Sequence, residues 1–167
     1  MCGIIGFTGN LQAPGILVDG LQQLEYRGYD SAGIAVNNGS ETKIVKTTGK
    51  VATLREKVEA TADLAGTCGI GHTRWATHGG VTEVNAHPHV SGNVTLIHNG
   101  IIENYKELAA SLKTKGFTAI SETDTEVAAM LIDSLYDGDP FAALKEADKA
   151  LEGAYGFCVM FKDHPGE

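Results

Sequence analysis

A chain of 167 residues has the length of one globular domain, and its 43% apolar and 20% charged residues exclude a disordered or collagen-like protein. A formal net charge of −8 repels phosphate backbones and anionic lipids, which argues against nucleic-acid and membrane-surface binding. The apolar runs are too short for a signal peptide or a membrane span, so the sequence predicts a cytoplasmic protein.

Hydrophobic periodicity predicts strands and helices in mixed order along the chain. Strands are expected at residues 4–8, 31–36, 42–47, 67–73, 93–98 and 154–162. Helices are expected at residues 15–26, 51–60, 104–115, 123–136 and 140–151. Because two strands follow one another across an Asn-Gly turn, layered α+β architecture fits better than a doubly wound parallel sheet.

Two helix starts carry capping signals. Thr123 precedes a helical run with Glu126 three residues later, which is a capping box. Asp139 with Pro140 marks the next helix start. The irregular segment 74–92 lies between predicted elements, and irregular segments of that length inside a compact domain are usually functional.

Cys2 is the first candidate for chemistry. Loss of Met1 would give it a free α-amine, whose usual pKa of about 7.7–8.0 makes it a base beside the thiol. The alternative is a packing cysteine at the start of a buried strand. Cys68 and Cys158 lie in apolar stretches and are expected to be inert core thiols, and three cysteines are too few for a disulfide framework.

Three other segments contain residues that each allow two interpretations. Arg74 suits a carboxylate ligand or a surface ion pair, and Trp75 suits a lid or the core. Asn99-Gly100 offers the two donors of an oxyanion hole, or simply a turn. Asp124 in the first turn of a helix complements the helix dipole or pairs with a substrate ammonium group.

Several histidines fall in a short stretch of the chain and raise the question of a metal. Their spacing matches none of the strong zinc templates, which usually include cysteines, so no metal and no cofactor is predicted. Metal binding stays open as an alternative that metal analysis would test. The histidines concerned are His72, His78, His87, His89 and His98.

Taken together, these segments resemble the class II glutamine amidotransferases, the N-terminal-nucleophile family, along essentially the whole chain. Within that family the resemblance is to the glutaminase domains of the glucosamine-6-phosphate synthases. The segments that carry it are Met1-Cys2-Gly3-Ile4-Ile5-Gly6, Tyr26-Arg27-Gly28-Tyr29-Asp30, Thr73-Arg74-Trp75-Ala76-Thr77-His78, Asn85-Ala86-His87-Pro88-His89, Ile97-His98-Asn99-Gly100 and Ser121-Glu122-Thr123-Asp124-Thr125-Glu126.

The resemblance implies a four-layer αββα sandwich and hydrolysis of L-glutamine to glutamate and ammonia through a glutamyl thioester on Cys2. Asn99 and Gly100 would stabilise the oxyanion. Arg74 would hold the substrate carboxylate and Asp124 its ammonium. The other implied site residues are Trp75, Thr77 and His78 in a loop over glutamine, and Arg27 near the nucleophile or at a domain interface.

The resemblance also implies a partner. Residues 1–167 correspond to a glutaminase domain that is expected to be truncated at its C-terminus. The sugar-isomerase domains that bind fructose 6-phosphate and accept the ammonia are not in this sequence. Unpaired sheet edges would favour a homo-oligomer. The alternative is a catalytically inactive glutamine-binding fragment or regulatory module.

Overall fold

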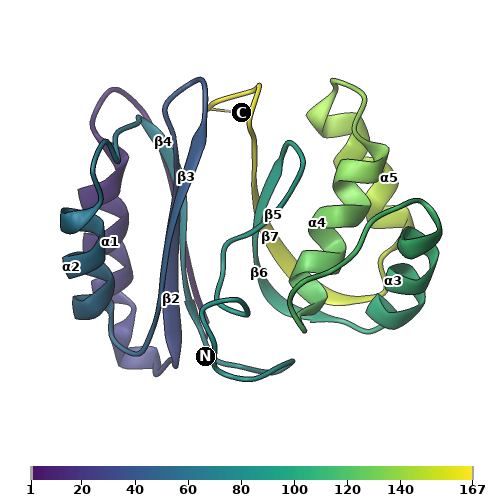
Figure 1. Ribbon diagram of the computed structural model, residues 1–167, viewed down its shortest axis with the longest axis horizontal. Coiled ribbons are helices and arrows are strands. Elements are labelled where there is room, and N and C mark those ends of the chain that lie inside the picture. Colours follow the sequence, from purple (N-terminus) through teal and green to yellow (C-terminus); the bar gives the residue numbers. More distant parts are fainter. Residues whose placement is uncertain (1, 167) are drawn as a thin grey trace.

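Four layers make up the part of the chain that the structure, a computed structural model, describes, which is residues 2–166. In Figure 1 one helix pair covers the outer face of the first sheet, the second sheet stacks against its inner face, and three helices cover the far side. The helices are α1 (Ala13–Gln23), α2 (Val51–Ala60), α3 (Tyr105–Thr114), α4 (Asp124–Leu135) and α5 (Pro140–Ala150). The expected αββα sandwich is confirmed.

The two sheets are antiparallel throughout. The first has the order β1-β4-β2-β3 and the second the order β5-β6-β7. The strands are β1 (Gly3–Thr8), β2 (Ser31–Asn37), β3 (Thr42–Thr48), β4 (Cys68–Arg74), β5 (His89–Ser91), β6 (Val94–Ile102) and β7 (Gly153–Phe161). The central strands β4 and β6 therefore lie in different sheets, and both contribute to the site described below.

Each interface between layers has its own apolar cluster. Leu17, Leu21 and Ile34 are fully buried between α1 and the first sheet. Leu96 and Ile132 are fully buried between the second sheet and its helices. The two sheets meet through a smaller cluster of buried residues, namely Ala35, Cys68, Ile70, Ile97 and Met160. Burial at about 25 cal/mol per Å² of apolar surface makes these interfaces the main source of stability.

Most predicted elements lie within a few residues of the observed ones, and three differences stand out. Strand β5 was not predicted. Helix α1 ends at Gln23 and is followed by a short 3₁₀ turn (Glu25–Arg27), where a continuous helix to residue 26 was expected. Strand β6 does not end at His98 but continues through Asn99 and Gly100, which pair with Gly156 and Tyr155 of β7.

The capping box at α4 is only half confirmed. The side chain of Thr123 accepts from the backbone N–H of Glu126, as predicted. The Glu126 carboxylate does not return to Thr123 but accepts from the N–H groups of Ile120 and Ser121, at 3.1 and 2.6 Å. Glu126 therefore holds the segment that leads into α4. The cap predicted at Asp139 is confirmed, since its carboxylate accepts from Ala142.

Candidate active site

A cavity of about 590 Å³ opens between the ends of strands β1, β4 and β6 and the start of helix α4. Its volume lies within the usual range for a small-molecule site. It is lined by Cys2, Gly3, Ile4, Leu24, Arg27, Arg74, Trp75, Thr77, His78, His87, His98, Asn99, Gly100, Ile101, Thr123, Asp124 and Thr125. Every residue to which the family resemblance gave a role in the site is in this set.

Cys2 lies at the entrance to strand β1, beside the end of β4. The backbone N–H of Gly3 donates to the hydroxyl of Thr73 at 3.1 Å, which anchors the start of the strand. The backbone N–H of Trp75 donates to the Cys2 sulfur at 3.1 Å, and that sulfur lies 3.6 Å from the Trp75 carbonyl. Cys2 is half-buried and lines the cavity, so a ligand in the cavity can reach its sulfur. The N–H of Trp75 gives that sulfur one directed donor.

Asn99 and Gly100 face Cys2 from the second sheet. The Asn99 side-chain nitrogen donates to the carbonyl of Cys2 at 3.4 Å. Gly100 has φ of +123°, and a Cβ built on it would lie 2.1 Å from the carbonyl oxygen of Ala154. Only glycine fits there, so the strand can keep its pairing with β7 at the cavity wall.

Arg74 ends strand β4 and is almost fully buried. Its guanidinium donates to the carbonyls of His78 and Gly80, the latter at 3.2 Å, so it also shapes the loop that follows it. The base of that loop is fixed by Asp30, whose carboxylate accepts from the N–H of Ala76 at 2.5 Å. The surface ion-pair interpretation of Arg74 does not hold, because the group lies inside the cavity wall.

Trp75 is 55% exposed and lines the cavity beside Cys2. Its indole packs against Gly28, where a Cβ would lie 3.3 Å from the ring. The interpretation of Trp75 as a core residue is therefore wrong. The signal that mattered was its place in a loop after a buried strand, not its residue type.

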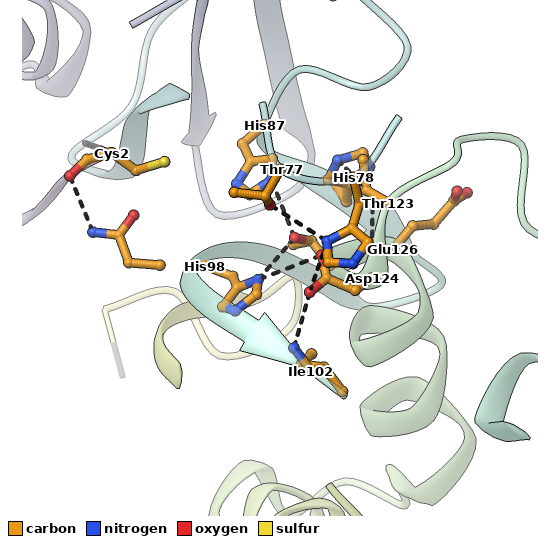
Figure 2. Close-up of polar contacts among 12 residues, drawn as sticks. Cys2, Thr77, His78, His87, His98, Ile102, Thr123, Asp124 and Glu126 are labelled. Carbon is orange, nitrogen blue, oxygen red and sulfur yellow. Dashed lines mark hydrogen bonds and ion pairs between the residues drawn. The ribbon is translucent and has the colours of Figure 1, made fainter. Parts of the chain in front are cut away.

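Asp124 is the first residue of α4 and is only 4% exposed, at the opposite end of the cavity from Cys2 (Figure 2). One carboxylate oxygen accepts from the backbone N–H of Ile102 at 3.0 Å. The ring nitrogens Nδ1 of His78 and His98 each lie 3.9 Å from a carboxylate oxygen. The helix start places the charge, and the cavity gives it access to a ligand.

A cluster of buried imidazoles forms part of the cavity wall, through His87 and His98, and continues into the interior. His72 and His87 stack with ring centroids 4.1 Å apart, and His87 contacts His89 and His98 at 5.0 and 6.5 Å. Burial lowers the pKa of His72 to about 4 and that of His89 to about 3. Burial also lowers the pKa of His87 and of His98, the latter opposed by the charge of Asp124.

The histidine cluster is built for ring packing and hydrogen bonding. Over residues 2–166, no three histidine, cysteine or acidic side chains converge in the way that a metal ion requires. One ring nitrogen of each of the four histidines faces a hydroxyl or an amide. Thr125 Oγ1 lies 3.0 Å from His98 Nδ1 and 3.1 Å from His87 Nε2, and Thr123 Oγ1 lies 3.1 Å from His89 Nε2.

Sequence reasoning did not single out all of the lining. It did not assign a role to Thr123 beyond its cap, or to Thr125, although both lie in the segment 121–126 that carries the resemblance. His87 and His98 were noticed only as candidate metal ligands. The alternation of hydroxyl and acidic residues in Ser121-Glu122-Thr123-Asp124-Thr125-Glu126 is the signal that could have identified the two threonines.

Comparison with known proteins gives the same class that the fold and cavity define. A model of the glutamine amidotransferase domain family matches residues 72–165, and the chain belongs to that family. The structure of glutamine phosphoribosylpyrophosphate amidotransferase from B. subtilis superposes with a TM-score of 0.81. That match has 29% identity and covers 97% of this chain and 35% of the other.

Among sequences, the chain is similar to glutamine–fructose-6-phosphate aminotransferases (isomerizing). It is 54% identical to that of Thermus thermophilus over 98% of its own length, and 52% identical to that of Idiomarina loihiensis over 99%. It spans only 27% and 28% of the length of these two relatives. Among residues 2–166, no helix has the length and apolarity needed to cross a membrane.

Proposed function

We propose that this chain hydrolyses L-glutamine to glutamate and ammonia with Cys2 as the nucleophile. The observation that carries the proposal is one cavity with a directed thiol at one end and a buried carboxylate at the other. Glutamine is a zwitterion with an amide at the far end of its side chain, and such a cavity suits both ends. Family membership supports the same substrate.

In this proposal two charged side chains of the cavity wall orient the substrate. Asp124 takes the α-ammonium group and Arg74 the α-carboxylate, the latter as a charge-assisted pair with the planar guanidinium. Thr77 and His78 close the loop side of the site, and Trp75 screens the sulfur from solvent. These contacts exist before and during reaction, so they position the side-chain amide more than they lower the barrier.

The chemistry proceeds in two balanced steps. The Cys2 sulfur attacks the amide carbon as the thiol proton passes to a base, the α-amine of Cys2. The carbonyl oxygen becomes an oxyanion. Asn99 Nδ2 and the Gly100 N–H donate to that oxyanion, which exists only during reaction, so these donors act on the rate. The C–N bond then breaks and ammonia leaves with the proton. Water attacks the resulting thioester and releases glutamate and the thiol.

The proposed base is the α-amine of Cys2, which requires removal of Met1. Met1 lies outside the described residues. An α-amine titrates near neutral pH, which allows it to accept and return the proton within the working range of an enzyme.

For a longer protein that contains this chain, we propose that ammonia released here aminates fructose 6-phosphate in sugar-isomerase domains. The names of the relatives and the 27% coverage support this role. The assignment of residues 1–167 to one glutaminase domain, the cytoplasmic location and a homo-oligomeric state are part of the proposal and rest on the sequence.

The test is intact mass with and without an electrophilic diazo-ketone analogue of glutamine, alongside a glutamate-release assay. We expect loss of the Met1 mass, a single adduct and glutamate release. Cys2→Ala should abolish both adduct and turnover. The matched control is Cys158→Ala, which removes a half-buried thiol outside the cavity and should leave both unchanged. Saturable glutamine binding without release would instead establish a non-catalytic binding module.

A further inference from the structure

The donor side chain Asn99 is itself held by a residue that does not line the cavity. His72 Nε2 lies 3.0 Å from Asn99 Oδ1, and this contact joins strand β4 of the first sheet to strand β6 of the second. His72 is fully buried, and it is absent from the cavity wall. Its effect on a ligand must therefore pass through a neighbour in the cavity wall, and the polar contact of that kind is the one with Asn99.

The hydrogen-bond network determines which way the Asn99 amide points. Its nitrogen donates to the carbonyl of Cys2 at 3.4 Å, and a carbonyl only accepts. A flipped amide would set its oxygen against that carbonyl oxygen and lose the bond. Asn99 Oδ1 therefore faces His72, and because an amide oxygen only accepts, His72 must carry its proton on Nε2.

The ring of His72 has little freedom to turn. On one side it stacks on His87 at 4.1 Å with an interplanar angle of 22°. His87 is in turn fixed by Thr125, whose hydroxyl contacts both His87 and His98. In the sheet, His72 lies opposite Gly33, where an added Cβ would come within 2.2 Å of the His87 carbonyl. Gly33 thus lets the His87 backbone approach the sheet beside His72.

We propose that His72 is a positioning residue for the reaction: as a neutral Nε2–H imidazole, it holds the Asn99 carboxamide with its N–H₂ toward the Cys2 end of the cavity. The inference rests on the proposed function. A carboxamide rotates about a soft terminal torsion and its two ends are nearly equal in size. Without a donor on its oxygen, Asn99 would divide its time between orientations and the oxyanion would lose a preorganised partner.

The test is a double-mutant cycle on glutamate release. His72→Leu removes the donor and keeps an apolar side chain. We expect kcat to fall about 10–100-fold with KM for glutamine within about twofold, since only the donor geometry changes. In an Asn99→Ala background the same substitution should change kcat by less than about threefold, because the group it acts through is gone.

Two further variants separate positioning from general damage. His72→Gln carries an amide N–H that can reach the place of Nε2 and should recover kcat to within about fivefold of wild type. His89→Leu removes an equally buried imidazole that contacts Thr123 and not Asn99. His89→Leu should change kcat by the same factor in the wild-type and the Asn99→Ala backgrounds, whatever the size of that factor.

A measurement without turnover covers the case in which a variant folds poorly. Ring ¹⁵N–¹H correlation spectra of the wild-type chain at pH 7 should show His72 protonated on Nε2. That signal should move in Asn99→Ala. A proton on Nδ1 would overturn the inference, and so would equal kcat losses for His72→Leu in both backgrounds. A wild-type chain that releases no glutamate would overturn the proposed function, and this inference with it.

Discussion

The two ends of the cavity are built from different chemistry. At the Cys2 end the groups that contact the nucleophile residue are uncharged donors, namely the N–H of Trp75 and the carboxamide of Asn99. At the other end lies the buried carboxylate of Asp124, and the buried guanidinium of Arg74 lines the same cavity. A formal charge at the Cys2 end would interact with the substrate at all stages, whereas neutral donors respond mainly to charge that develops during reaction. The comparison predicts that substitutions at the first end alter kcat and those at the second alter KM.

The largest effect is expected at the sulfur. Cys2→Ala should lower kcat by at least about 10⁴-fold, because no other group in the cavity can form the thioester. Glutamine binding should persist, which a ligand-dependent shift of Tm would show. Glutamate release by this variant at anything near the wild-type rate would assign the chemistry to another group.

The next largest effect is expected at the donors. Asn99→Ala should lower kcat about 10²–10³-fold and leave KM within a few-fold, since one oxyanion donor is lost. Steady-state kinetics measures both. An equal rise in KM would mean that Asn99 binds the ground state instead, and would remove the distinction between the two ends.

At the charged end, Asp124→Asn should raise KM for glutamine about 10–100-fold with a smaller change in kcat. The amide keeps an oxygen for the N–H of Ile102 but loses the charge-assisted contact with the ammonium, which is usually about 1.5–3 kcal/mol. The control is Asp133→Asn on the same helix, whose carboxylate contacts Ser91 and Asn93 far from the cavity. A KM unchanged in Asp124→Asn would contradict the assignment.

The smallest effect concerns stability, not turnover. The pKa values of about 4 for His72 and about 3 for His89 lie below the value of about 6.5 in an unfolded chain. Between these limits the unfolded state binds protons that the folded state does not, so stability is retained above pH 6.5 and lost as pH falls toward 4. Each group should contribute about 2 kcal/mol of destabilisation between pH 7 and pH 5.

Urea denaturation at the two pH values measures this loss. His72→Gln has no titrating ring, so its free energy of unfolding should fall by about 2 kcal/mol less than that of the wild type between pH 7 and pH 5. Equal free energies of unfolding at pH 7 and pH 5 in the wild type would mean that the cluster becomes charged inside the fold.

Local patterns predicted most of the fold. The helix from Val51 to Ala60 was bounded correctly, and the caps at Thr123 and Asp139 were anticipated, because capping and periodicity depend on neighbours in the chain. The end of β6 was missed because Asn99-Gly100 is a turn signature. Pairing with Gly156 and Tyr155, more than fifty positions away, overrides it, and no local window contains that information.

The functional site likewise has a part that the sequence predicts and a part that depends on contacts between distant segments. The motifs that carry the family resemblance contained every predicted site residue, and the cavity gathers them. The part played by His72 was out of reach, since its contact with Asn99 exists only after two sheets stack. The spacing of the histidines in the sequence could not show that the rings of His72 and His87 stack face to face.

The bond between Asn99 and Cys2 joins residues 97 positions apart and crosses from one sheet to the other. Neither sheet alone contains a nucleophile and an oxyanion donor. A partly folded chain, with either half formed and the other loose, would therefore expose a cysteine without being able to hydrolyse glutamine. Activity in this architecture therefore requires that both sheets are assembled. The time at which glutaminase turnover appears during refolding would measure when the two halves of the sandwich dock.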